Sequence, residues 1–183
     1  MSQFKIISKA ALAASFVFIT SACASSDGET ESPIPGQVAL NTLWLSSQCN
    51  LLPAAVKALE PEQNLNAAAV ERVIVVRDAA KWQLFWKSVH SSQFEAPPAP
   101  EVDFDKHSLI AVIAAPQSRS GGGIELAGNA ARADDLLQVP VTIRDPAPGT
   151  MSAAVVTQPC VVVQTYPALE DDLKVTAGAS STN

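Results

Sequence analysis

The residue types that most often carry catalysis are few in this chain. The two histidines, His90 and His107, stand outside any HExxH motif and beside no cysteine pair, so the sequence offers no ligand set for zinc. His90 falls at the expected end of a helix, where an imidazole usually interacts with terminal carbonyls or with the helix dipole. His107 closes an acid-rich turn (DFDKH), where a structural role is commoner than a role as general base. We therefore expect no metal and no cofactor.

Candidate nucleophiles lack recognisable partners. There is no G-x-S-x-G motif, so no nucleophile elbow is indicated. Ser118 and Ser120 flank Arg119, and no histidine is identifiable as their base. Cys160 could pair with His107, but a cysteine within an apolar strand is more often part of the core or of a disulfide. We expect a protein that is not an enzyme; a hydrolase using Ser120 or Cys160 is the alternative.

One glycine cluster stands out, Gly121 to Gly123. A phosphate-binding loop would need a helix after it, and here a strand-like segment follows. The pattern favours a hairpin that requires positive φ. The alternative is a flexible loop whose backbone approaches a partner, with Arg119 adding a charged contact. We take Arg119, Gly121, Gly122 and Gly123 as the candidate partner-binding residues.

These loops must be positioned by strands and one helix. Residues 70–77 (VERVIVVR) predict a strand, and Asp78 after them is a typical helix N-cap. Behind it, large apolar residues recur at i, i+3, i+4 and i+7, which predicts an amphipathic helix packed on a sheet. These residues are Trp82, Phe85, Trp86 and Val89.

Later segments read as strands. Residues 108–115 (SLIAVIAA) are continuously apolar, which is typical of a strand covered on both faces. Residues 136–144 alternate with period two, and Pro140 among them predicts an edge strand or a bulge. With residues 158–166 and the segment from Gln37 this makes five to seven strands. We expect an α+β fold, a mostly antiparallel sheet with one main amphipathic helix packed on a face.

The N-terminus has the three parts of an export signal. Two lysines precede the apolar stretch Ala10–Ile19, and small residues lead to Cys23. That stretch is shorter than the roughly 20 residues of a membrane-spanning helix. The site resembles the bacterial lipobox, although Thr20 stands where the lipobox prefers Leu. We expect residues 1–22 to be removed and Cys23 to carry acyl chains such as palmitate; ordinary secretion with Cys23 incidental is the alternative.

The expected domain organisation follows from this site. Residues 23–36 form a lipidated tether, 37–172 a single domain and 173–183 a flexible polar tail. Ala24, directly behind Cys23, resembles the pattern of Gram-negative lipoproteins that move to the outer membrane. We expect a lipoprotein of the cell envelope, anchored in the outer membrane on its periplasmic or surface face.

The net charge limits the classes of partner that we expect, and the cysteine count indicates a cross-link. Without residues 1–22 the chain has ten basic and eighteen acidic residues, a net charge of −8. This argues against nucleic acid and against docking on anionic lipid. Cys49 and Cys160 remain, and in an oxidising compartment such a pair favours a disulfide; two buried free thiols are the alternative.

The order of these features resembles a known family. A helix with the core Trp82–Trp86 leads through a proline-rich loop to Val102–Phe104; the glycine turn Gly121–Gly123, a Pro148–Gly149 turn and a Val-rich strand, Pro159–Val163, follow. This resembles the C-terminal domain of the PrcB family, named for a lipoprotein subunit of a surface protease complex. The resemblance covers residues 70–166.

The resemblance implies a non-enzymatic role, that of binding, stabilising or assisting another exported protein such as a protease. The family's glycine turn usually continues Gly-Gly-Tyr, and Gly123 stands where that Tyr would be. The glycine loop is also similar to that of chagasin-type cysteine-protease inhibitors. The alternative function is therefore a loop-inserting protease inhibitor that uses loops 117–123 and 145–150.

Overall fold

The computed structural model describes residues 36–60, 62–63, 69–146 and 153–182. The expected signal, the lipidation site Cys23 and all but the last residue of the expected tether lie outside these residues. Across the described ranges, no helix is both long enough and apolar enough to span a bilayer.

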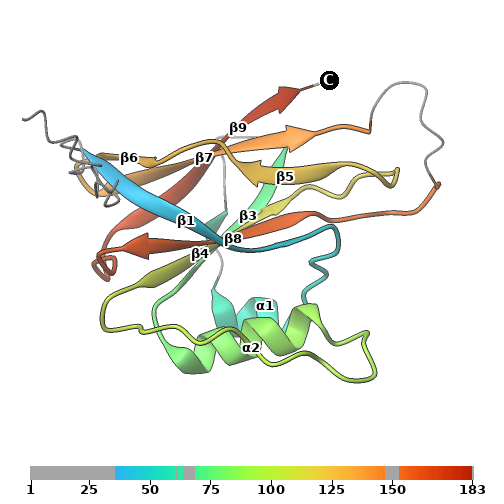
Figure 1. Cartoon of the computed structure of the whole chain (residues 1–183), viewed down its shortest axis with the longest axis horizontal. Coiled ribbons are helices and arrows are strands. Elements are labelled where there is room, and N and C mark those ends of the chain that lie inside the picture. The colour runs from blue at the N-terminus through green and yellow to red at the C-terminus, as the bar shows by residue number, and fades with distance from the viewer. Residues whose placement is uncertain (1–35, 61, 64–68, 147–152, 183) are drawn as a thin grey trace, which may run out of the picture. The chain divides into compact units, whose positions relative to one another are not determined.

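The described residues form two short helices and nine strands (Figure 1). The helices are α1 Pro53–Leu59 and α2 Ala79–Val89. The strands are β1 Gln37–Ser46, β2 Glu62–Gln63, β3 Val70–Val76, β4 Ser108–Ala114, β5 Gly123–Leu126, β6 Ala130–Ala133, β7 Leu136–Arg144, β8 Cys160–Tyr166 and β9 Lys174–Thr182.

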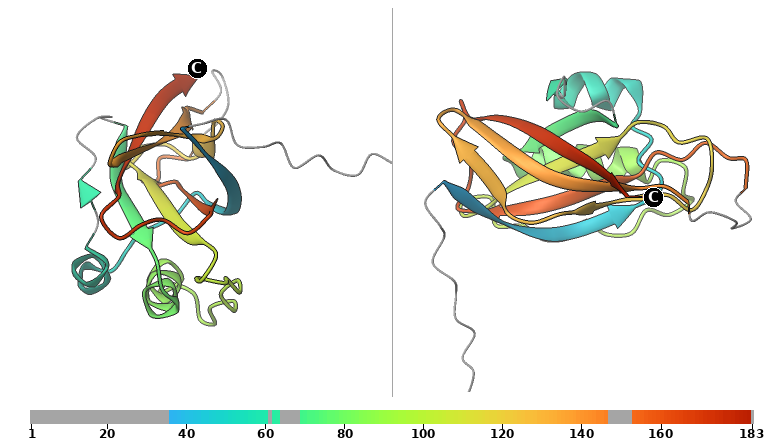
Figure 2. Two further views of the ribbon diagram at one scale, coloured as in Figure 1. Left: turned by 90° about the vertical axis from the view of Figure 1, so that its left-hand side faces the viewer. Right: turned by 90° about the horizontal axis from the view of Figure 1, so that it is seen from above.

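The sheet is mostly antiparallel and barrel-like. Its strand order is β2-β3-β4-β8-β1-β6-β7-β5, and β9 runs parallel to β7 on the other side of that strand. Seen end on, the strands curve around an interior, and both helices lie on one side of it (Figure 2). The α+β expectation is confirmed in this coarse form. The expectation of one main helix is too simple, because α1 packs beside α2.

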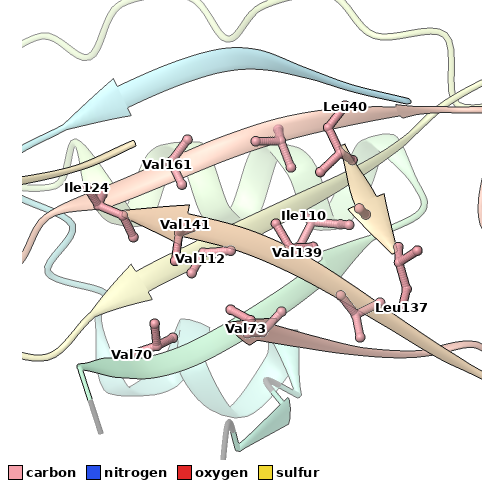
Figure 3. Close-up of a cluster of buried hydrophobic side chains, with 14 of the residues drawn as sticks. Leu40, Val70, Val73, Ile110, Val112, Ile124, Leu137, Val139, Val141 and Val161 are labelled. Carbon is pink, nitrogen blue, oxygen red and sulfur yellow. The ribbon is translucent and has the colours of Figure 1, made fainter. Parts of the chain in front are cut away.

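Two apolar clusters form because side chains alternate between the faces of the central strands. On β4, Ile110 and Val112 point to the barrel interior, where they meet Val139 and Val141 of β7 (Figure 3). The intervening Leu109 and Ile113 face the helices, so every residue of β4 is buried. The prediction of a strand covered on both faces is confirmed.

The helix layer is fastened by its cap and by its tryptophans. Asp78 Oδ1 accepts a hydrogen bond from Lys81 N (2.8 Å), so the predicted N-cap is confirmed. The ring nitrogens of Trp82 and Trp86 donate to the carbonyls of Pro100 (2.9 Å) and Pro97 (2.7 Å). Each tryptophan therefore buries its ring in the core and also holds the proline-rich loop against α2.

The prediction of an edge strand or a bulge at Pro140 is wrong, because β7 is an inner strand and its register with β9 runs through Pro140 without a shift. Strand β7 has β9 on one side, and β6 followed by β5 on the other. The carbonyl of Pro140 accepts from Ala127 N (2.9 Å) at the step from β6 to β5. The missing N–H points to that same side, between the pairs that β7 makes with β6 and those it makes with β5, so the proline is accommodated inside the sheet.

The expected flexible tail, 173–183, is instead mostly strand β9. Val175 and Ala177 are buried in the interior cluster, and β9 is in register with β7 over its whole length. The preceding loop is held by Arg77, whose Nη2 donates to the carbonyls of Glu170 (3.0 Å) and Leu173 (3.3 Å). Backbone pairing thus orders a segment that has few large apolar side chains.

Cys49 and Cys160 form a disulfide, as predicted, with their Cα atoms 5.8 Å apart. Both residues are fully buried beneath the helices, and the bond lies where β1 ends and β8 begins. It closes a loop across 111 residue positions.

We predict that the double variant Cys49→Ala/Cys160→Ala loses about 2–5 kcal/mol of unfolding free energy, because its unfolded chain is no longer constrained by the cross-link. Urea denaturation followed by tryptophan fluorescence measures the loss. Wild-type protein unfolded with a reductant present should show a similar loss, which separates the cross-link from the packing of the sulfur atoms. An unchanged denaturation midpoint in both samples would contradict the prediction.

Candidate partner-binding site

Two segments meet at one end of the sheet, and we call them together the loop end: residues 115–123, which follow β4, and 153–158, which precede β8. Gln117 and Thr157 exchange backbone hydrogen bonds (2.7 and 2.9 Å), and Ser120 N donates to Ala153 O (3.1 Å). These bonds join segments that are more than 30 positions apart in the sequence. The structure therefore brings the predicted loop 117–123 onto a defined neighbour.

The end of β1 borders the loop end. Gln158 N donates to Ser47 O (3.2 Å), and Gln48 Nε2 donates to Val156 O (3.4 Å). Three aliphatic side chains here are substantially exposed: Leu45 (51%), Val155 (48%) and Val156 (68%). Exposed aliphatic side chains make this end of the sheet a candidate surface for contact with another protein.

The glycine turn is built into this end by packing. Gly121 has φ +97°, which suits a residue without Cβ. A Cβ on Gly122 would lie 2.8 Å from the carbonyl oxygen of Arg144 and would overlap Gln117 Oε1. Gly123 opens β5 and has open space around its Cβ position. The positive φ is confirmed for Gly121, but the hairpin is not, since β4 and β5 pair with different strands.

The side chain of Arg119 is exposed at the loop end, whereas its backbone takes part in a hydrogen bond within the domain. Its carbonyl accepts from Thr157 Oγ1 (3.3 Å), so the guanidinium is presented from a fixed backbone. Of the candidate residues, Arg119 is available to a partner through its side chain, and Gly121 and Gly122 shape the loop. Loop 145–150 was predicted to act beside them; residues 145 and 146 are described, and 147–150 lie outside the described residues.

Val155 and Val156 were missed by sequence reasoning. They lie outside any strand or helix, between two stretches of small and polar residues. The segment has no repeating apolar pattern from which a buried or exposed face could be predicted. The signal available was two adjacent β-branched residues in a segment without secondary structure.

The candidate catalytic residues are not brought together. Cys160 is in the disulfide, and Nδ1 of His107 contacts Thr165 O (2.9 Å). Thr165 and Cys160 pair with opposite ends of β4, five positions or about 17 Å apart along the strand. A Cys160–His107 nucleophile is therefore ruled out by the register.

The other catalytic candidates have structural partners. Ser120 Oγ accepts from Ala153 N (2.9 Å), which ties the two loop segments together. His90 is buried at the end of α2 with Nδ1 2.9 Å from Trp86 O, and its ring packs against Trp44 and Trp86. No cluster of three or more His, Cys, Asp or Glu suited to a metal ion occurs in the described part of the chain.

Acidic residues gather at the opposite end of the sheet, which we call the tether end because β1 begins there. Arg132 bonds to Glu170 (2.6 Å), and this contact raises the pKa of the arginine. Asp134, Asp135 and Asp172 line a small hollow of about 210 Å³ with the same pair. The side chains are exposed, so these ion pairs contribute little to stability.

A similar exposed contact occurs on the turn before β4. Lys106 Nζ donates to Asp103 Oδ2 (2.7 Å), and this hydrogen bond lowers the pKa of the Asp103 carboxyl below its ordinary value. Asp103 also closes a local turn, since its Oδ1 accepts from Asp105 N (3.2 Å). The acid-rich turn is thus internally bonded.

A hollow of about 620 Å³ lies beside α2, between Trp82, Gln83 and residues 99–104. Trp82 Nε1 already donates to Pro100 O, and the lining includes Gln83, Glu101 and Asp103; we assign the hollow no ligand.

No family model, curated protein or solved structure matches this chain. The resemblance to the PrcB family therefore stays a prediction, and a function has to be argued from the geometry of the loop end.

Gly122→Ala should destabilise the protein by about 1–3 kcal/mol, because the added methyl meets a backbone carbonyl that cannot move aside freely. Gly123→Ala is the matched control and should stay within about 0.5 kcal/mol of the wild type, since its methyl enters open space. Thermal unfolding of the two variants compares them directly. Equal stabilities would show that the packing around Gly122 is not as described.

Proposed function

We propose that this protein is a non-enzymatic lipoprotein of the cell envelope. It is anchored in the outer membrane through Cys23, and its loop end binds another exported protein and stabilises or assists it. The PrcB resemblance makes a protease the first class of partner to test. The observation that carries the proposal is that β1 begins at one end of the domain, whereas Leu45, Val155 and Val156 are exposed near the other.

Strand β1 connects the two ends. At its start, Gly36 O accepts from Arg132 N (2.6 Å) and Gln37 pairs with Ala131. At its finish, Ser46 pairs with Cys160 next to the loop end. Ten strand residues span about 33 Å. A chain anchored ahead of Gly36 therefore enters at the tether end, and the loop end lies a strand's length away (Figure 1).

Charge supports the same orientation. The tether end carries Asp134, Asp135, Glu170 and Asp172. An anionic membrane surface repels such a face, so it does not hold the domain flat against the lipid. The residues between Cys23 and the domain, 24–36, can reach at most about 45 Å. The loop end is then available to proteins in the surrounding compartment.

The loop end has the composition of a contact surface. Leu45, Val155 and Val156 supply apolar area, and Arg119 supplies an exposed charge from a fixed backbone. Arginine and apolar side chains within one patch are common in protein interfaces. The nearby Ser120 and Cys160 are engaged in structural bonds, which favours binding over hydrolysis.

The test is capture of partners from intact cells with a C-terminal tag, chemical crosslinking and mass spectrometry. We predict that Val155→Asp/Val156→Asp reduces the captured partner by about tenfold, because charges replace buried apolar contacts of an interface. Leu136→Asp is the control: it introduces one negative charge at an exposed leucine of the tether end and should leave capture unchanged.

If Val155→Asp/Val156→Asp captured as much partner as Leu136→Asp, the loop end would be rejected as the binding surface. If the wild-type protein captured no exported protein, the proposed function would be rejected. Hydrolysis of model substrates by the purified protein would also count against it, provided that replacing Ser120 abolished the activity.

The alternative, a loop-inserting protease inhibitor, is favoured by the side-by-side placement of residues 117–123 and 153–158. Titration of purified cysteine and serine proteases separates the two functions. Unchanged rates would remove the inhibitor, whereas saturable inhibition that Val155→Asp/Val156→Asp abolishes would establish it.

A further inference from the structure

Strand β1 has a partner on only one side along most of its length. Residues Ala39–Ser46 pair with β8, whereas on the other side only Gln37 and Val38 pair with β6. Strand β5 likewise pairs only with β7. These statements concern the described residues. Beyond β6, no backbone pairing joins β1 to β5 among the described residues, although the two strands lie in contact.

The open edge of β1 presents backbone hydrogen-bonding groups. In an antiparallel ladder every second residue directs its N–H and C=O away from the paired strand. Among the described residues, no backbone hydrogen bond outside the β8 ladder involves Ala39–Leu45. Such an edge can pair with an added strand.

This edge has few of the features that protect natural edges. Charged residues and prolines usually block strand addition, and the sequence ALNTLWLS of residues 39–46 contains neither. A bulge between Thr42 and Trp44 interrupts the register and divides the edge into two short pieces. The edge is therefore suited to a short added segment.

We infer that the edge Ala39–Ser46 binds an extended, uncharged segment of the exported partner by strand addition. This inference rests on the proposed function, because the edge ends at the loop end: Gln48, two positions beyond β1, donates to Val156 O. A strand added along β1 thus lies beside Leu45 and approaches the exposed valines. Main-chain hydrogen bonds supply affinity in this mode, and side chains supply selectivity.

The absence of charge on the edge of β1 indicates which kind of partner segment can bind there. The edge residues of β1 carry no charge, and Glu125 on β5 is already bonded to Arg144 (2.6 Å). A charged residue in the added strand would lose hydration here without gaining a partner. An uncharged segment that alternates apolar and small polar residues fits the edge.

The chain's own residues 24–35 fit it poorly. Strand β6 occupies the first two positions of the same edge, and Arg132 N donates to Gly36 O, which blocks a direct fold-back. That segment also contains Pro33, Pro35 and three acidic residues. A second copy would bring together two chains that each have a net charge of −8 from Cys23 on.

The experiment uses the full chain in mild detergent and one defined probe, an acetylated and amidated peptide of eight alternating threonines and valines. A control peptide has prolines in place of the threonines, which removes backbone donors. Hydrogen–deuterium exchange of residues 39–46 should slow with the first peptide and not with the second. Asn41→Lys, which adds a charge at an exposed edge position, should weaken peptide binding by about tenfold. Gln83→Lys adds the same charge on α2 and should not change it.

Several results would overturn the inference: no slowing at residues 39–46, equal binding of both peptides, or wild-type affinity of Asn41→Lys. Slow exchange of the amides that point away from β8, before any peptide is added, would also overturn it. Loss of that protection on deleting residues 24–35 would identify the chain's own segment as the occupant, and loss on dilution would identify a second copy.

Partner capture separates the two proposals. If wild type and Asn41→Lys capture an exported protein equally, strand addition fails and the proposed function stands. If neither captures one, the proposed function fails, and the assignment of the edge to an exported partner fails with it.

Discussion

The fold depends on two neighbouring strands that must bury both of their faces. Every residue of β4 is buried, and β8 is buried from Cys160 to Val163. Apolar area left in water costs about 25 cal/mol per Å², so each face needs its own cover. The curved half of the sheet covers one face, and α1 and α2 with the proline-rich loop cover the other. The barrel and the helix layer therefore both follow from the need to bury the two faces of β4 and β8.

Strand β1 has a different position in this arrangement. It is paired with β8 along its length and joined to the disulfide at its end, but it meets the other half of the sheet only at Gln37 and Val38. This makes β1 both the link between the tether end and the loop end and the strand at which the curved sheet lacks backbone pairing among the described residues. The proposed anchor, the proposed partner contact and the edge without a ladder among the described residues thus all involve one strand.

Much of the central fold could be predicted from local patterns. The cap at Asp78, the buried face of α2 and the doubly covered β4 each depend on neighbours within one element, so periodicity is sufficient to find them. Strand β9 could not be found in this way, because its small residues are ordered by pairing with β7. The position of Pro140 inside a paired strand depends likewise on where β6 ends and β5 begins.

At the candidate site the division is similar. The sequence alone determined that the chain has a glycine-rich turn, a cysteine pair for a disulfide, and histidines and serines without catalytic motifs. Only the tertiary structure decided that residues 117–120 bond to 153–157, that Gly122 is required by Gln117 and Arg144, and that β1 keeps an open edge. The physical reason is that residue pattern determines which side chains prefer to be buried, whereas the pairing of distant strands determines which loops meet and which backbone groups lack a partner.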